Sequence, residues 1–178
     1  MNEQKGENRG ALLRSKGQPK TPACYLIVVN DVTSDSQVTK AKEIVEFLLG
    51  KGIWIFHDLA PHMKKFVLAD RLIIYTAGSS RTFVAEVRVA SEVLPLDGKL
   101  KQEVASLGLT WFTKYVRVTQ IHFLNPPRPI QNLLPRLGFV TDKKNYGLFL
   151  RQGVRKLDSR DVRVILGACP GKGICGGG

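Results

Sequence analysis

The stretch RLIIYTAGSSRTFVAEVRVASEV, residues 71–93, decides the fold class because it holds two strand patterns joined by a short polar connection. Residues 71–75 are rich in β-branched and aromatic side chains, and over residues 82–93 apolar positions recur at every second residue. The connecting residues 77–80 (AGSS) are typical of a turn. The stretch therefore predicts a β-hairpin.

Strand character extends to both sides of this hairpin. Residues 24–30 (CYLIVVN) form a nearly continuous apolar run, as expected of a strand buried on both faces, and residues 52–57 (GIWIFH) form a shorter one. Residues 112–124 alternate between two faces, and we expect residues 125–127 (NPP) to end that strand because proline cannot donate to the ladder. A further short strand or extended segment is predicted over residues 145–150.

Helical patterns are fewer. Residues 38–49 place their apolar side chains on one helical stripe, with capping chemistry in residues 34–37 and Gly50 and Gly52 at the end. Shorter helical segments are expected at three places, namely after Pro61, over residues 129–134 and over residues 159–166 following Asp158. Five or six strands with few helices, in a chain too short for a doubly wound sheet, favour an α+β fold with a small mixed β-barrel.

The chain of 178 residues suits one domain with a tail at each end. We expect a flexible basic arm over residues 1–22, the barrel domain over 23–166 and a flexible glycine-rich tail over 167–178. No uncharged run approaches the roughly 18–20 residues of a membrane span, and residues 1–20 lack the apolar segment of a signal peptide. The expectation is a cytoplasmic protein with no membrane partner.

The charge balance gives the first indication of function. The chain carries 27 Lys and Arg against 15 Asp and Glu, a formal net charge of +12 at pH 7. An excess of this size favours a polyanionic partner, such as nucleic acid, through steering and counterion release. Charge alone says nothing about specificity, since many proteins are basic only to stay soluble.

No catalytic pattern is present, so we expect a protein that is not an enzyme and needs no metal or other cofactor. The sequence lacks the phosphate-binding GxxxxGK[ST] loop, HExxH and GxSxG. His57 and His62 could hint at a metal or acid–base site, but exposed or hydrogen-bonded histidines are the more common case. Cys24 lies in the most apolar run and is expected to be an inert core thiol, and with three cysteines in all the chain has no disulfide framework.

Two clusters of residues have the chemistry to bind a nucleobase. Trp54, Phe56 and Tyr75 lie in predicted strands, where aromatic residues are more often core, but they could also stack on an unpaired base. Residues 141–147 (TDKKNYG) read as a polar loop from composition alone. Their lysines, amide and aromatic ring would equally suit a rim that closes over a base.

Taken together, several segments resemble the EVE domain, a family of the PUA-like superfamily related to YTH and ASCH domains. The resemblance covers about residues 24–166, and the segments that carry it are residues 25–30, 52–56, 63–75, 83–87, 129–134 and 139–147. It implies a closed or nearly closed mixed barrel with helices at its edges. It also implies a pocket that recognises modified bases in DNA or RNA.

Residue by residue, the resemblance assigns a base pocket to Asn30, Trp54, Phe56, Tyr75, Asn145 and Tyr146. Around it, we expect four lysines and the basic arm to neutralise the phosphates of the nucleic acid: Lys64, Lys65, Lys143 and Lys144. The resulting hypothesis is a binding module that turns a base into an aromatic pocket.

Two other functions stay open at this stage. The barrel could hold a small ligand or dock a partner protein, with its charge serving solubility; binding that is independent of salt would favour this alternative. A hydrolase of nucleic acid is less favoured because Glu86 and Glu92 are isolated carboxylates in their strand. The sequence does not distinguish DNA from RNA, name the base modification or give the oligomeric state.

Overall fold

The computed structural model describes residues 21–34 and 37–167. Of the arm expected over residues 1–22, only Thr21 and Pro22 are described, and of the tail expected over 167–178, only Gly167. Both tail predictions therefore lie almost wholly outside the described residues. Within the described part of the chain, no helix is both long enough and apolar enough to span a membrane.

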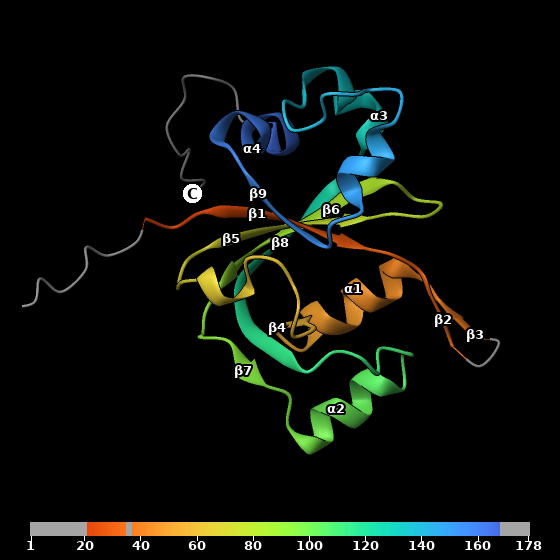
Figure 1. The fold of residues 1–178 in the computed structure, drawn as a ribbon, viewed down its shortest axis with the longest axis vertical. Helices are drawn as coiled ribbons and strands as arrows, with labels where there is room; N and C mark the ends of the chain where they lie inside the picture. Colours follow the sequence, from red (N-terminus) through yellow and green to blue (C-terminus); the bar gives the residue numbers. More distant parts are fainter. Residues whose placement is uncertain (1–20, 35–36, 168–178) are drawn as a thin grey trace, which may run out of the picture.

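One mixed sheet organises the structure (Figure 1). From edge to edge its strands are β4 (Ile53–Phe56), β8 (Lys114–Pro129), β6 (Thr82–Val89), β5 (Arg71–Thr76), β1 (Cys24–Val29) and β9 (Val154–Leu157). β1 and β5 run parallel and the other neighbours run antiparallel, while the short β7 (Leu94–Pro95) pairs with β8. The sheet curls into an open half-barrel. The predicted α+β fold with a small mixed barrel and flanking helices is confirmed, although the described sheet stays open where the resemblance implied a closed or nearly closed barrel.

The β5–β6 hairpin is the centre of this sheet. Its register pairs Leu72 with Val87 and Ile74 with Ala85, and a bulge follows between Ile74 and Tyr75. Residues 72–76 are all buried, whereas β6 alternates between buried and half-buried positions. The hairpin predicted from the sequence therefore forms, because both strands have apolar side chains to bury.

Helices cover both faces of the sheet. The helices are α1 (Ala41–Gly50), α2 (Gly98–Ala105), α3 (Ile130–Leu133) and α4 (Ser159–Leu166). Figure 1 shows α1 and α2 on one side of the sheet and α3 and α4 on the other. Two apolar cores result, one between α1 and the inside of the curl and one between the outside of the curl and residues 130–166.

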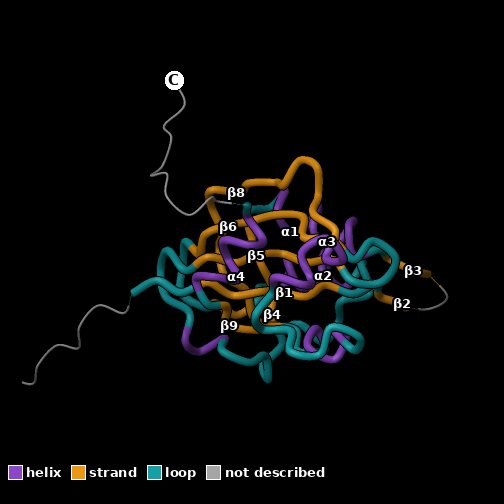
Figure 2. Tube along the Cα trace, turned by 90° about the horizontal axis from the view of Figure 1, so that it is seen from above, coloured by secondary structure: helices purple, strands orange, loops and turns teal. Residues whose placement is uncertain are grey.

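Three predicted elements are wrong in extent or type. The first helix begins at Ala41 instead of Val38, because residues before it form a separate hairpin, β2 (Val32–Ser34) and β3 (Gln37–Thr39). This hairpin projects from the body of the sheet in both views (Figures 1 and 2). Val38 consequently lies exposed on β3.

β8 does not end at its prolines but runs on to Pro129, with Arg128 opposite Phe83. Pro126 and Pro127 fall in an irregularity of the β6–β8 ladder, between the pairs Ala85–Phe123 and Phe83–Arg128, so their missing N–H groups interrupt no regular pairing. The predicted strand over 145–150 is instead a 3₁₀ segment, η3 (Tyr146–Leu150). A short apolar run does not by itself separate these two conformations.

Candidate functional site

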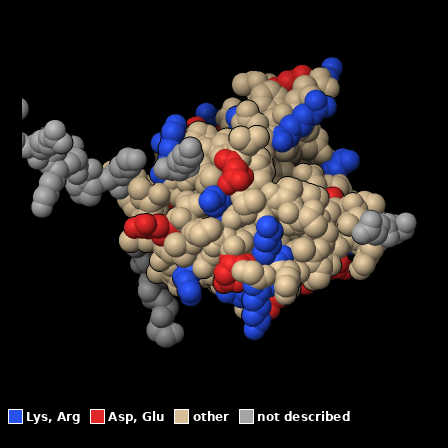
Figure 3. All heavy atoms as spheres, turned by 60° about the horizontal axis from the view of Figure 1, so that its bottom comes forward, with Lys and Arg blue, Asp and Glu red and all other residues tan. Residues whose placement is uncertain are grey.

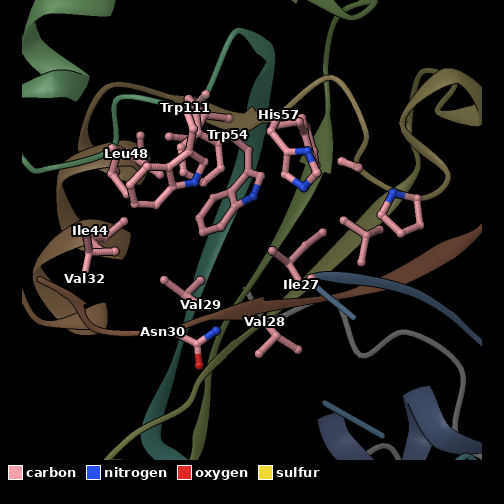
Figure 4. A pocket seen from close by; sticks show the side chains of 18 residues that line it. Ile27, Val28, Val29, Asn30, Val32, Ile44, Leu48, Trp54, His57 and Trp111 are labelled. Carbon is pink, nitrogen blue, oxygen red and sulfur yellow. The ribbon is translucent and has the colours of Figure 1, made fainter. Parts of the chain in front are cut away.

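An apolar cavity of about 210 Å³ opens inside the curl, between β1, α1 and β4. We call it the aromatic cavity, because Trp54, Phe56, Trp111 and Phe112 line it together with aliphatic side chains such as Ile44. Figure 4 shows the two indoles of this group close together above β1. Its charged or titratable lining is limited to His57. The cavity can therefore hold a flat apolar ring but offers little for a charged group.

The aromatic walls differ in how they are held. Trp54 and Phe56 lie on β4, which pairs with β8, and their side chains are 3% and 2% exposed, so they are part of the core. Trp111 lies just before β8 and is 52% exposed, with its ring 5.7 Å from that of Phe112. Trp111 is therefore a stacking surface that a ligand can reach without unpacking the core.

A second hollow lies on the other side of β1. Figure 4 shows that Ile27 and Val29 point toward the indoles, whereas Val28 and Asn30 point to the opposite side of the strand. This follows from the two-residue alternation of strand side chains. Asn30 is the residue that lines both hollows.

We call this second hollow the arginine pocket, since Arg81 and Arg151 line it with Asn30, Tyr75 and Tyr146. Tyr75 is 1% exposed and packs its ring 5.1 Å from that of Phe83. The Tyr146 hydroxyl lies 3.3 Å from a guanidinium nitrogen of Arg81, which can donate to it. Burial raises the pKa of Tyr75 to about 12, helped by nearby Tyr146 and opposed by the charge of Arg81. The Tyr75 hydroxyl consequently keeps its proton at neutral pH.

The six residues predicted for the base pocket are thus divided between two hollows. Trp54 and Phe56 line the aromatic cavity, Tyr75 and Tyr146 line the arginine pocket, and Asn30 lines both. Asn145 lines neither hollow, because its side-chain amide donates to the Asp142 carboxylate at 2.8 Å.

Of the four lysines predicted to bind phosphate, the three whose side chains are described line neither hollow. Lys143 donates through its ammonium to the backbone carbonyls of Leu137 and Val140, so it holds a turn together. Lys65 and Lys144 are exposed and line neither hollow, and the Lys64 side chain is outside the described part of the structure. Asp142 accepts from the Lys144 backbone N–H, and Asn145 holds the pKa of Asp142 below its ordinary value through its own hydrogen bonds.

The positive charge is not concentrated in one field on the face shown in Figure 3, where basic and acidic groups are interspersed. Several of the basic groups are neutralised locally: Lys40 by Asp31 at 3.2 Å, Lys51 by Glu103 at 2.8 Å and Arg71 by Glu86 at 2.6 Å. Arg81 and Arg151 are not among the cations paired with a carboxylate in the described residues. The arginine pocket therefore offers positive charge to a ligand.

The remaining candidates for chemistry have structural explanations. The His57 ring nitrogen Nδ1 accepts from the Leu59 N–H at 3.1 Å, and the His62 ring packs 5.8 Å from that of Tyr25. Burial raises the pKa of Cys24 to about 12, which disfavours its thiolate. Across residues 21–34 and 37–167, no three His, Cys, Asp or Glu side chains group closely enough to hold a metal ion.

Sequence reasoning missed three residues that shape these hollows: Trp111, Arg81 and Arg151. Trp111 could have been found, since it is one of only two tryptophans and directly precedes the strand predicted over residues 112–124. The two arginines could not, because they lie 70 residues apart and meet only through the fold.

No known protein family and no curated protein matches the sequence. Solved structures do match the fold. An ASCH protein from Zymomonas mobilis aligns over 82% of this chain and 94% of its own, with 9% identity and a TM-score of 0.52. Human THYN1 in complex with DNA containing 5-methylcytosine aligns over 82% and 96%, with 11% identity and a TM-score of 0.50.

A protein from Pseudomonas putida aligns over 82% of this chain and 98% of its own, with 13% identity and a TM-score of 0.53. At these identities the likeness shows the fold alone, which this chain shares with the ASCH protein and with human THYN1. Membership of the EVE family in particular stays a prediction.

Proposed function

We propose that this chain is a non-enzymatic nucleic-acid-binding module that holds a modified base of DNA or RNA in the aromatic cavity. The observation that carries the proposal is the pairing of a buried indole, Trp54, with a half-exposed one, Trp111, across a small apolar hollow. A base stacks on such rings because each has an extended π-face. Trp111 would cover the base and Trp54 would form the inner wall.

The size of the cavity supports this ligand class. Its volume of about 210 Å³ is below the roughly 300–1,000 Å³ typical of pockets for drug-sized molecules, so it suits one ring system. An added methyl group on a base would find an apolar lining from Ile44 and Leu48. Discrimination of a methylated base then arises from burial of that methyl group in apolar surroundings.

Two further observations agree with a nucleic acid. The chain carries a net charge of +12, which favours polyanions. The human THYN1 structure that shares this fold is bound to DNA containing 5-methylcytosine. The proposal that this chain belongs to the EVE family, as its segments suggest, is consistent with both.

The test is a binding panel measured by fluorescence anisotropy, with unmodified and base-methylated DNA and RNA oligonucleotides. We expect preference for one methylated base, and Trp111→Ala should weaken that interaction by roughly 5–150-fold, as loss of about 1–3 kcal/mol of stacking requires. Phe123→Ala is the matched control, because Phe123 is also half exposed, at 49%, but lines neither hollow.

Equal binding of all oligonucleotides by the wild type and Trp111→Ala would contradict the proposal. The second candidate is a module for an apolar small ligand, favoured by the scarcity of charge in the cavity lining. It would show as ligand binding that is insensitive to salt and to added oligonucleotide.

A further inference from the structure

We propose that the arginine pocket is a phosphate site, and that the phosphate it binds belongs to the strand whose base occupies the aromatic cavity. This inference rests on the proposed function. The pocket is lined by two arginines, two tyrosines and one asparagine amide, and by no carboxylate. Guanidinium, hydroxyl and amide donors of this kind match the several acceptor oxygens of a phosphodiester.

Arg81 is held in place for this role. Its Nε donates to the Gly78 carbonyl at 3.1 Å and its Nη1 lies 3.3 Å from the Tyr146 hydroxyl, so the guanidinium is fixed at the pocket wall. Its backbone has φ +46°, a left-handed conformation that is unfavourable for a residue with a Cβ. The Arg81 carbonyl accepts from the Ile130 N–H at 3.0 Å, which ties this conformation to the start of α3.

Tyr75 supplies a buried polar group at the same place. It lines the arginine pocket with its side chain, which is 1% exposed. A tyrosine hydroxyl at a pocket wall can donate to a phosphate oxygen. Since burial raises the pKa of Tyr75 to about 12, this hydroxyl is available as a donor at neutral pH.

The Asp31 carboxylate, which lies close to the pocket, does not cancel its charge. Asp31 lies beside Gly78, where a Cβ would come within 3.4 Å of its oxygen. That carboxylate is already occupied, because one oxygen accepts from the Ala41 N–H at 2.8 Å and the other lies 3.2 Å from the Lys40 ammonium. Arg151 is exposed and belongs to no ion pair in the described part of the chain.

Asn30 connects the two hollows. It directly follows β1, which ends at Val29, it lines both the aromatic cavity and the arginine pocket, and it is exposed. A nucleotide that places its base on one side of β1 can therefore pass its sugar over Asn30 and set its phosphate on the other side. Base and phosphate would then be recognised in two separate hollows that meet at Asn30.

The experiment compares Arg151→Gln with Arg160→Gln, an exposed arginine on α4 that lines neither hollow, using the oligonucleotide that the wild type prefers. Affinity is measured by fluorescence anisotropy at several salt concentrations. Arg151→Gln should lower affinity about tenfold and reduce the slope of log K against log salt by about one, whereas Arg160→Gln should leave both unchanged. Preference for the modified base should persist in both variants. Tyr75→Phe should weaken binding with no change in salt slope, because it removes a donor without a charge.

Equal slopes for Arg151→Gln and the wild type, with base preference intact, would overturn the phosphate site and leave the proposed function standing. If the wild type shows no base preference, the proposed function fails instead. Inorganic phosphate is then titrated while the arginine side-chain NMR signals are followed. Shifts that Arg151→Gln abolishes would show a site for free anions, and would overturn the proposal that the phosphate belongs to a nucleic-acid strand. If no signal shifts, the phosphate site itself is overturned.

Discussion

The aromatic cavity and the arginine pocket lie back to back across the end of β1, yet they are built in opposite ways. The cavity is lined by side chains of the inner core, with Trp54 and Phe56 fully packed and Trp111 at its mouth. The pocket is lined by polar groups fixed by hydrogen bonds, with Arg81 between Gly78 and Tyr146. The comparison shows how two chemistries meet at the end of one strand, since Asn30, which directly follows β1, lines both hollows.

The largest expected effect is on the free energy of unfolding. It distinguishes Trp54, in the wall of the aromatic cavity, from Trp111 at the mouth of the cavity. Trp54→Ala should lower the free energy of unfolding by about 3–5 kcal/mol, because it removes a buried aromatic side chain and leaves a cavity. Trp111→Ala should change it by less than about 1 kcal/mol, because half of that side chain is already in water. Urea denaturation of both variants measures the difference.

A Trp54→Ala variant as stable as the wild type would show that the cavity is not part of the core. The same result would contradict the contrast drawn between the two hollows, because substitution of the cavity wall would then cost no more stability than substitution of a surface residue. Tyr115→Phe on the neighbouring β8 provides a control for mild changes to an aromatic residue at this edge of the sheet.

The sequence predicts the sheet well because its strands carry strong local patterns. Residues 24–29 and the β5–β6 hairpin are apolar or alternating throughout, and these patterns depend only on their own residues. The start of α1 is harder to predict. Val38 fits the apolar stripe of the helix, but it lies in β3, where it pairs with Thr33. There, pairing within a local hairpin prevails over the helical periodicity of the side chains.

The hollows are harder to predict than the sheet. That Trp54 and Tyr75 are aromatic residues in strands is plain from the sequence, but which side of the sheet each faces depends on register, and a bulge lies directly before Tyr75. Lys143 looks like a phosphate ligand until the fold places two backbone carbonyls around its ammonium. Such partners come from the path of the backbone, which no side-chain motif encodes.

A smaller effect on stability is expected at Asp161, which anchors the segment leading to the arginine pocket. The buried Asp161 carboxylate of α4 accepts from the Gly138 N–H at 2.6 Å and the Phe139 N–H at 3.1 Å, and so ties the segment leading to Tyr146 onto α4. Asp161→Asn turns an amide donor toward one of these N–H groups and should lower the free energy of unfolding by about 1–3 kcal/mol. Hydrogen exchange at residues 138 and 139 should become faster, while the base preference should remain.

The matched control is Asp158→Asn, which changes the other carboxylate at the start of α4. Asp158 caps the helix by accepting from the Asp161 N–H at 2.7 Å, and asparagine caps helices about as well as aspartate. It should therefore cost only a few tenths of a kcal/mol. Equal losses of stability in both variants would mean that Asp161 does not anchor the segment leading to the arginine pocket. Loss of base preference in Asp161→Asn would mean that the aromatic cavity depends on the same anchor.

The smallest effect concerns Asp31, which touches the supports of both hollows. Its carboxylate accepts from the N–H of Ala41, at the start of the helix that lines the aromatic cavity, and lies beside Gly78 in the arginine pocket. The hydrogen bond from Ala41, with the contribution of Lys40, holds the pKa of Asp31 below its ordinary value. A lowered pKa in the folded state means that this carboxylate stabilises the fold above the ordinary value of about 3.9, and that the gain is lost as the pH falls through the lower folded value.

Unfolding in urea between pH 6 and pH 2.5 should therefore show a gap between the wild type and Asp31→Asn that is widest at pH 6 and closes as the medium becomes acidic. Glu46→Gln is the control, since its carboxylate lies 3.7 Å from Lys42 on the exposed side of α1 and such surface pairs contribute little at any pH. The amide NMR signals of Ala41 and Gly78 should move together over the same acidic range, because one carboxylate lies against both. If the two signals titrate separately, the Asp31 carboxylate does not act on both hollows. The hollows would then share only their position at the end of β1.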